Sequence, residues 1–276
     1  MNTSSSSRAT FSGVAFALVT LVATACSRST PPATATIEAV TATPTLQASS
    51  PTAVVPSDTP TPAPPTDTPT AMPGDGSGGG VPAPTQTPDP SPLVACRDIL
   101  APLDKAHRLA PDCAPSGLQE LPASISSGGA QYLIGPAAAA IESLFRAAAA
   151  AGFPLAVNSS YRSYAVQVYT YNYWVSTQGR AYADRTSAVP GHGEHQLGTT
   201  ADVGTGGRIL ENFSGTPAAA WLAANSWKFG FIVSYPPGKE AITGYAPEPW
   251  HIRWVGTSVA ASVHASGLTL HEYLLR

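Results

Sequence analysis

The chain has 276 residues, enough for one or two domains, and its net charge of −3 at pH 7 includes no run of lysine or arginine. This charge balance argues against nucleic acid as a partner. More than half of the 28 prolines fall in the first third, whereas every Trp, Tyr and His lies after residue 92. We therefore expect both the buried core and the polar chemistry within residues 93–276.

The first 26 residues have the three-part form of a secretory signal. Arg8 precedes an apolar run, residues 14–22, that is too short to span a bilayer as a mature helix, and Cys26 follows Ala23-Thr24-Ala25. This resembles a bacterial lipobox, so we expect residues 1–26 to be a lipoprotein signal peptide and Cys26 to carry lipid. The alternative is cleavage after an Ala-x-Ala site and ordinary secretion. In both cases the protein is extracytoplasmic, and any contact with the membrane is through the lipid anchor alone.

Residues 27–92 are rich in Thr, Pro, Ala and Ser and contain a glycine-rich stretch at residues 74–80. Such a segment cannot bury enough apolar surface to offset the entropy lost on ordering, which predicts a disordered linker. Its proline-rich part favours extended polyproline II and would give an anchored domain a long reach. A stalk with no length requirement is the alternative.

Two cysteines remain in the domain that follows. In an oxidising compartment Cys96 and Cys113 are expected to form a disulfide rather than to stay as free thiols. Their spacing does not match the paired Cys-x-x-Cys signatures of thiol zinc sites. We therefore assign both cysteines a structural role.

Helical and strand patterns alternate through residues 93–276. Gly135-Pro136 opens an alanine-rich helix that Gly152 ends, and Thr216-Pro217 opens another. The patterns predict helices at residues 135–151, 164–178, 216–225 and 257–266, and strands at residues 153–158, 229–233 and 250–255. The fold class expected is α+β: a single compact domain with a small, mostly antiparallel sheet flanked by helices.

Residues 191–202, together with Glu248-Pro249-Trp250-His251, carry the strongest chemical signal. They offer His195, Asp202 and His251 as metal ligands. His195 and Asp202 are seven residues apart, which is not the spacing of two ligands on one helix face. The Gly198-Thr199-Thr200 break between them predicts a turn feeding a strand, so that the two side chains converge. No His-Glu-x-x-His motif is present, which disfavours a thermolysin-like architecture.

Glu248 is the expected general base. Positions three apart on an undistorted strand face opposite ways, so Glu248 and His251 reach one metal only if Pro249 bends the chain. Zinc held by three protein groups keeps a position for water and lowers the pKa of that water, and Glu248 would take the proton. Arg162 would offer a fixed positive charge to the developing oxyanion or to a substrate carboxylate. This set predicts amide hydrolysis.

These motifs resemble the VanY-type D-alanyl-D-alanine carboxypeptidases, members of the LAS group of zinc metallopeptidases of the bacterial cell wall. The matching pieces include Ser160-Tyr161-Arg162-Ser163-Tyr164, residues 190–202 and residues 248–256. The resemblance implies the LAS/hedgehog-type fold and one zinc ion per domain, held by His195, Asp202 and His251. It also implies Glu248 as base and substrate contacts from Arg162, Gln167, Tyr161 and Ser163.

Two positions depart from the family motif Ser-x-His-x-x-Gly-x-Ala-x-Asp. Gly193 stands where the family has Ser, and Thr200 stands where it has Ala. The metal ligands and the base are untouched, but the missing hydroxyl lies beside a ligand and removes a possible bond to the peptide. His192 is expected at the rim of the site rather than among the ligands.

The function implied is hydrolysis of the terminal D-Ala-D-Ala bond of peptidoglycan stem peptides by a monomeric enzyme. A D,D- or L,D-dipeptidase, or a peptidoglycan endopeptidase, on the same site is the alternative within chemistry. A non-catalytic wall-binding lipoprotein is the alternative outside it. Loss of Glu248 or of a ligand would favour that last hypothesis, and none of them is lost.

Overall fold

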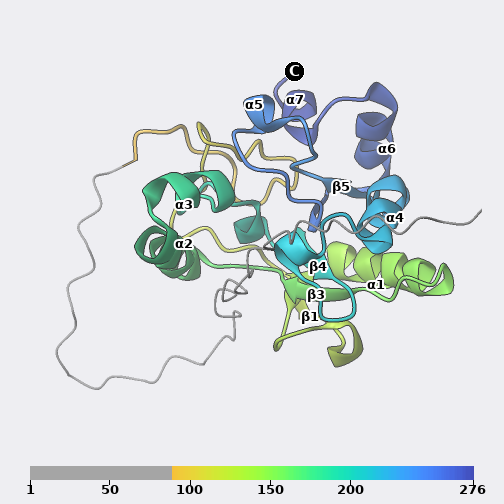
Figure 1. Cartoon of the computed structure of the whole chain (residues 1–276). Coiled ribbons are helices and arrows are strands. Elements are labelled where there is room, and N and C mark those ends of the chain that lie inside the picture. The colour runs from red at the N-terminus through yellow and green to blue at the C-terminus, as the bar shows by residue number, and fades with distance from the viewer. Residues whose placement is uncertain (1–88) are drawn as a thin grey trace, which may run out of the picture. The chain divides into compact units, whose positions relative to one another are not determined.

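The computed structural model describes residues 89–276, and its elements are labelled in Figure 1. The predicted signal peptide, the lipidation site Cys26 and the linker as far as residue 88 lie outside the described residues. Within residues 89–276, none of the helices has the length and apolar character needed to cross a membrane.

A four-stranded antiparallel sheet positions the chemistry. Its strands, in spatial order, are β3 (Ala156–Ser159), β4 (Thr200–Gly204), β6 (His251–Trp254) and β5 (Phe231–Val233). The register of β4 against β6 sets Asp202 directly opposite His251. Because side chains alternate along a strand, Ala201, Val203 and Ile252 enter the apolar core, and Asp202, His251 and Arg253 point to the opposite face.

The main core lies between this sheet and two helices, α1 (Gly135–Ala150) and α4 (Pro217–Asn225). A proline in the first turn opens each helix, where its missing N–H removes no intrahelical bond. The buried stripe of α1, spaced at three and four residues, is Ile141, Leu144, Phe145 and Ala148. Both helices lie where the sequence patterns predict them.

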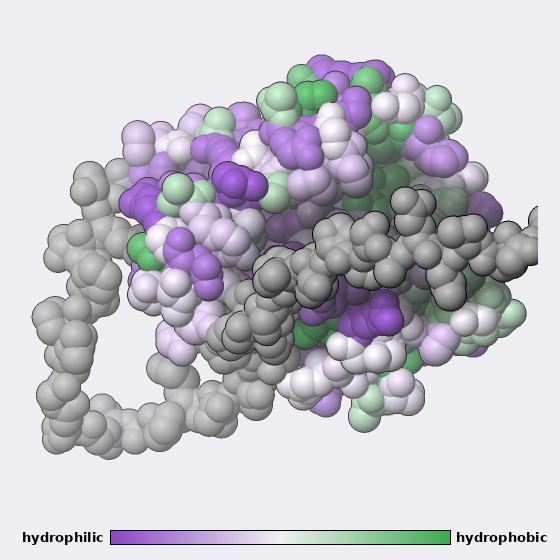
Figure 2. Space-filling model, viewed as in Figure 1, coloured by the Kyte–Doolittle hydropathy of each residue, from purple (hydrophilic) through white to green (hydrophobic). Residues whose placement is uncertain are grey.

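A second helical unit, α2 (Tyr164–Gln178) and α3 (Arg180–Thr186), lies across the strands from α1 and α4 in Figure 1. The Ser163 hydroxyl caps α2 by accepting from the N–H of Val166 at 3.3 Å. An aromatic cluster joins the two helices, built on Tyr171 and Trp174. In Figure 2 hydrophilic residues gather over this unit, and the surface is more apolar on the side of α4 and α6.

The remaining elements are short. They include the two-stranded sheet of β1 (Leu118–Glu120) and β2 (Tyr132–Ile134), and the helices α5 (Glu240–Thr243), α6 (Thr257–Ser266) and α7 (Leu270–Leu274). The helices expected at residues 164–178 and 257–266 are confirmed. Helix α3, helices α5 and α7, and strands β1 and β2 were not predicted from the sequence.

The predicted strands are all longer than the observed ones. The strand expected at residues 153–158 begins only at Ala156, since Pro154 has no N–H for a ladder bond. The strand expected at residues 229–233 begins at Phe231, because Ser226–Phe229 forms a 3-10 turn that ends at Gly230 with φ 88°. The strand expected at residues 250–255 is His251–Trp254.

Candidate metal centre

Three segments bring the expected ligands together. His195 lies in a 3-10 turn (Glu194–Leu197), Asp202 lies in the middle of β4, and His251 is the first residue of β6. Gly198 ends the turn with φ 68°, and a Cβ there would lie 3.0 Å from the side chains of Leu118 and Pro115. One ligand atom from each of His195, Asp202 and His251 lies within 4.8 Å of the others. Among residues 89–276, these three form the group that could hold a metal ion.

Hydrogen bonds fix which ring nitrogen each histidine presents. The Nδ1 of His195 lies 2.6 Å from the carbonyl oxygen of Ser160, and the Nε2 of His251 lies 2.9 Å from the Glu194 carboxylate. Both oxygens only accept, so both nitrogens carry the proton. This leaves Nε2 of His195 and Nδ1 of His251 facing Asp202, at 3.3 and 3.2 Å from its two oxygens.

The donor set and its charge fit a divalent cation. The buried Oδ1 of Asp202 faces the Nδ1 of His251 at 3.2 Å but forms no well-aligned hydrogen bond among the described residues. Burial would raise the pKa of Asp202, but interactions with His195 and His251 hold it well below its usual range. Burial tends to lower the pKa of His251, yet Asp202 and Glu194 raise it to about 10. Two imidazoles and one carboxylate in such a negative environment match a zinc site with one open position.

Glu248 lies beside the ligands because the chain turns between it and β6. The His251 N–H donates to the Glu248 carbonyl at 3.0 Å, and the Glu248 N–H donates to Tyr235 at 2.9 Å. This turn sets the Glu248 Oε2 3.5 Å from the Nδ1 of His251. Burial, helped by the negative charge of Asp202, raises the pKa of Glu248 to about 8. A carboxyl with such a pKa is suited to take a proton and return it near neutral pH.

Arg162 is held at the edge of the same site. Its guanidinium donates to the Gln167 side chain at 3.0 Å and to the Ser159 hydroxyl at 2.7 Å, and its backbone N–H donates to the carbonyl of His195 at 3.2 Å. Burial lowers the pKa of His195 and raises that of Glu248, and the positive charge of Arg162 acts to lower both. The structure thus places the fixed positive charge of the Arg162 side chain beside the metal ligands and Glu248.

The other substrate contacts expected from the resemblance occupy different positions. Gln167 is buried, and its amide nitrogen donates to the Ser187 hydroxyl and to the carbonyl of Ala188, so it bridges Arg162 to that backbone. Ser163 caps α2. Tyr161 is partly buried, which raises the pKa of its phenol. Their contact with substrate stays a prediction.

His192 differs from expectation. It was expected at the rim, but it is 4% exposed and lies outside the ligand group. Its Nδ1 is 2.6 Å from the carbonyl of Asp104, and its Nε2 is 2.7 Å from the carboxylate of Asp89. His192 therefore binds the start of the described chain to the domain. Composition assigned residues 89–92 to the linker. In the structure they provide the Asp89 carboxylate that bonds His192 and the Pro92 carbonyl that accepts from the N–H of Arg108.

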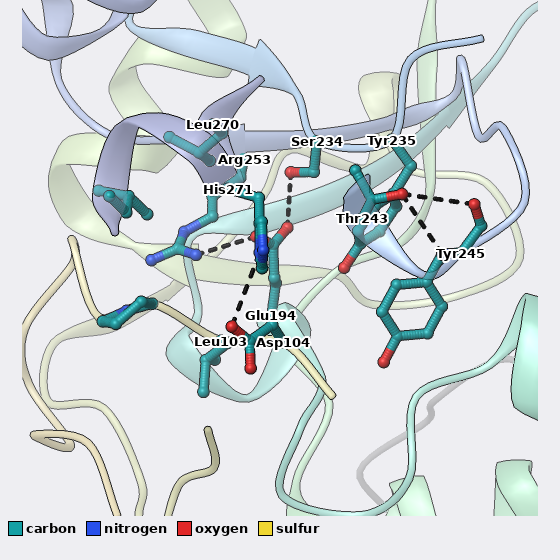
Figure 3. A pocket seen from close by; sticks show the side chains of 12 residues that line it. Leu103, Asp104, Glu194, Ser234, Tyr235, Thr243, Tyr245, Arg253, Leu270 and His271 are labelled. Carbon is teal, nitrogen blue, oxygen red and sulfur yellow. Dashed lines mark hydrogen bonds and ion pairs between the residues drawn. The ribbon is translucent and has the colours of Figure 1, made fainter. Parts of the chain in front are cut away.

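The sequence reasoning missed a buried network behind His251. Glu194 bonds His251, Ser234 and Arg253, and in Figure 3 the last two side chains point at its carboxylate. Glu194 was noted only as the residue that rules out a His-Glu-x-x-His motif. One signal was available: Arg253 is two residues after His251, so a strand sets both on one face.

The disulfide between Cys96 and Cys113 closes a loop that lies against the ligand segment. The Gln196 side chain donates to the carbonyls of Ala110 and Cys113 at 2.9 and 3.1 Å. The N–H of Leu109 donates to Gly191 at 2.9 Å. The loop formed by residues 96–113 therefore supports the turn that carries His195.

Comparison with known proteins identifies a family. The sequence profile described as VanY: D-alanyl-D-alanine carboxypeptidase matches residues 130–257. A D-alanyl-D-alanine carboxypeptidase of Enterococcus faecalis is 40% identical over 143 residues, 49% of this chain and 52% of that enzyme. The chain thus spans about half the length of the curated relatives it matches.

Two solved structures resemble the described fold. The LdcB LD-carboxypeptidase is 36% identical, with a TM-score of 0.62, over 68% of this chain and 91% of that one. The vancomycin-resistance D,D-pentapeptidase VanY from a VanB-type cassette, solved with Zn(II), is 33% identical. Its TM-score is 0.55, over 63% of this chain and 98% of that one. The fold is therefore that of the LAS-type carboxypeptidases, as expected from the sequence.

Proposed function

The chain belongs to the VanY family of D-alanyl-D-alanine carboxypeptidases, and from this we propose that it is a zinc-dependent carboxypeptidase. Its substrate would be the peptidoglycan stem peptide that ends in D-Ala-D-Ala, from which it releases the last D-alanine. The observation that carries the proposal is the Glu248 carboxylate, 3.5 Å from the inward-facing nitrogen of His251 within the ligand group.

The residues divide the chemistry among them. A zinc ion held by His195, Asp202 and His251 would polarise the scissile carbonyl and make a water molecule more acidic. Glu248 accepts the proton of the attacking water and returns it to the nitrogen of the departing D-alanine as the C–N bond breaks. Arg162 offers its charge to the developing oxyanion or to the free carboxylate of the substrate.

An L,D-carboxypeptidase is the second candidate, because the LdcB LD-carboxypeptidase has the higher TM-score of the two structures, 0.62 against 0.55. The two activities differ in the configuration of the residue before the scissile bond. A dipeptidase is also represented among relatives, since one from Enterococcus gallinarum combines D-Ala-D-Ala dipeptidase and carboxypeptidase activities and is 36% identical over 118 residues.

Product analysis separates these candidates. The purified protein is incubated with a stem pentapeptide ending in D-Ala-D-Ala, with the tetrapeptide that lacks the last residue, and with free D-Ala-D-Ala, and products are identified by mass spectrometry. We expect tetrapeptide and D-alanine from the pentapeptide alone. Glu248→Gln should retain zinc and lose about 10²–10⁴-fold in kcat. Release from the tetrapeptide alone would assign the L,D activity, and no release from any substrate would refute the proposal.

We also propose that the enzyme works outside the cytoplasm as a monomer, anchored by lipid on Cys26. The disulfide between Cys96 and Cys113 supports an oxidising compartment, where such bonds persist. Cell fractionation tests the anchor. Wild-type protein should remain with the membrane, and Cys26→Ser should abolish lipid labelling. Wild-type protein found wholly in the medium, without lipid, would leave ordinary secretion as the explanation.

A further inference from the structure

Glu194 lies directly behind one of the ligands. Its Oε2 is 2.9 Å from the Nε2 of His251 and 2.6 Å from the Ser234 hydroxyl, and its Oε1 accepts from the Arg253 guanidinium at 2.9 Å. Figure 3 shows Ser234, just after β5, and Arg253, within β6, converging on this carboxylate. All four side chains are buried, so water does not replace these bonds.

The carboxylate controls the form of the His251 ring. A carboxylate oxygen only accepts, so the nitrogen that faces it must carry the proton. Nδ1 faces the carboxylates of Asp202 and Glu248, and a ring that binds a cation through Nδ1 keeps a single proton, on Nε2, where Glu194 accepts it. A half-turn of the ring would set a C–H at the position of Nδ1, and the other tautomer would set an N–H there, so neither could bind the cation. Contacts of this kind commonly fix the orientation and basicity of metal ligands.

Arg253 fixes Glu194 in turn. It is 0% exposed, and its second terminal nitrogen donates to the carbonyls of Ile99 and Ala101, each at 2.8 Å. Its guanidinium is a fixed positive charge 2.9 Å from the Oε1 of Glu194, in a buried pair. Glu194 is therefore an ionised acceptor with fixed partners on both sides.

We propose that Glu194 is a positioning residue for the metal: held by Arg253 and Ser234, it keeps His251 in the tautomer and orientation that bind the cation through Nδ1. The inference rests on the metal site of the proposed function but not on the identity of the substrate. It adds a role to a residue that bonds a metal ligand and lies outside the ligand group itself.

Metal affinity tests the role without relying on turnover. Glu194→Gln keeps the shape but offers one accepting atom where the carboxylate has two, so it cannot accept from both His251 and Arg253. We expect its zinc dissociation constant, measured by competition with a chromophoric chelator, to rise about 10–100-fold. The matched control is Asp104→Asn, since Asp104 is also a buried carboxylate bonded to a histidine, His107, that is outside the ligand group. The control should keep the wild-type zinc affinity.

Long-range ¹H–¹⁵N NMR of the wild-type imidazoles gives a test that needs no variant to fold. With zinc bound, His251 should carry its proton on Nε2 and bind through Nδ1. Zinc on Nε2 of His251, or wild-type zinc affinity in folded Glu194→Gln, would overturn the inference. If zinc binds as expected but no peptide is cleaved, the inference stands and the proposed function fails.

Discussion

Removal of the disulfide should weaken both the domain and its metal site. Cys96→Ser with Cys113→Ser leaves near-isosteric side chains but releases a loop whose ends are 17 residues apart. That loop provides the carbonyls of Ala110 and Cys113 that hold Gln196, the neighbour of His195. It also provides the carbonyls that hold Arg253.

The size of the effect follows from the loop length. In the chain-entropy model, a loop of this size contributes about 3 kcal/mol to the free energy of unfolding, because the cross-link restricts the unfolded chain. For a domain of this size, 1 kcal/mol moves Tm by about 2–4 °C. The double variant should therefore melt about 6–12 °C lower. Its zinc dissociation constant should rise severalfold, because the segments behind two ligands are less firmly held.

Calorimetry of the zinc-loaded and zinc-free forms measures the change in Tm, and chelator competition measures the zinc dissociation constant. In protein produced without lipid on Cys26, Cys26→Ser is a suitable control, since it removes a cysteine that is not in the disulfide and should change neither quantity. A double variant that melts within about 1 °C of wild type would refute the stability argument. Unchanged zinc affinity in a clearly destabilised variant would refute the link between the loop and the ligands.

Three further predictions concern the site. Chelation should abolish activity and lower Tm, because metal at about 1,000 times its dissociation constant adds about 4 kcal/mol to folding; activity and Tm that survive chelation would exclude a required metal. Arg162→Lys should raise KM at least several-fold, since an ammonium cannot reproduce the guanidinium fork that bonds Gln167 and Ser159, and an unchanged KM would exclude substrate contact. Gly193→Ser should fold normally, because its Cβ would meet Ala188 at 3.4 Å and Gln167 at 3.7 Å, and should lower KM. A KM that does not fall would show that the family hydroxyl does not bind this peptide.

The sequence predicted helices best where their ends carry chemical signals. Pro136 opens α1, Ser163 caps α2 and Pro217 opens α4, and all three helices begin within a residue of expectation. Strands β1 and β2 have three residues each and pair only with one another. Segments that short carry no readable alternation, so tertiary contacts decide them.

Residue types at motif spacing were enough to propose the ligands and the base, but not the groups that hold them. The bond between Glu194 and His251 joins positions 57 residues apart, and Arg253 reaches back more than 150 residues to Ile99. Such pairs depend on which strands are neighbours, which the sequence alone does not give. His192 shows the same limit, because its burial comes from Asp89 and Asp104, both distant in the chain.

The core and the metal site depend on one strand register. With Asp202 opposite His251, the alternation along β4 and β6 sends Val203 and Ile252 into the core. A slip of one residue would exchange the two faces, burying the ligand carboxylate among apolar side chains and exposing the core residues. Burying an unpaired charge costs free energy, whereas burying an apolar side chain is favourable. Hydrophobic packing against α1 therefore selects the register that brings the ligands together.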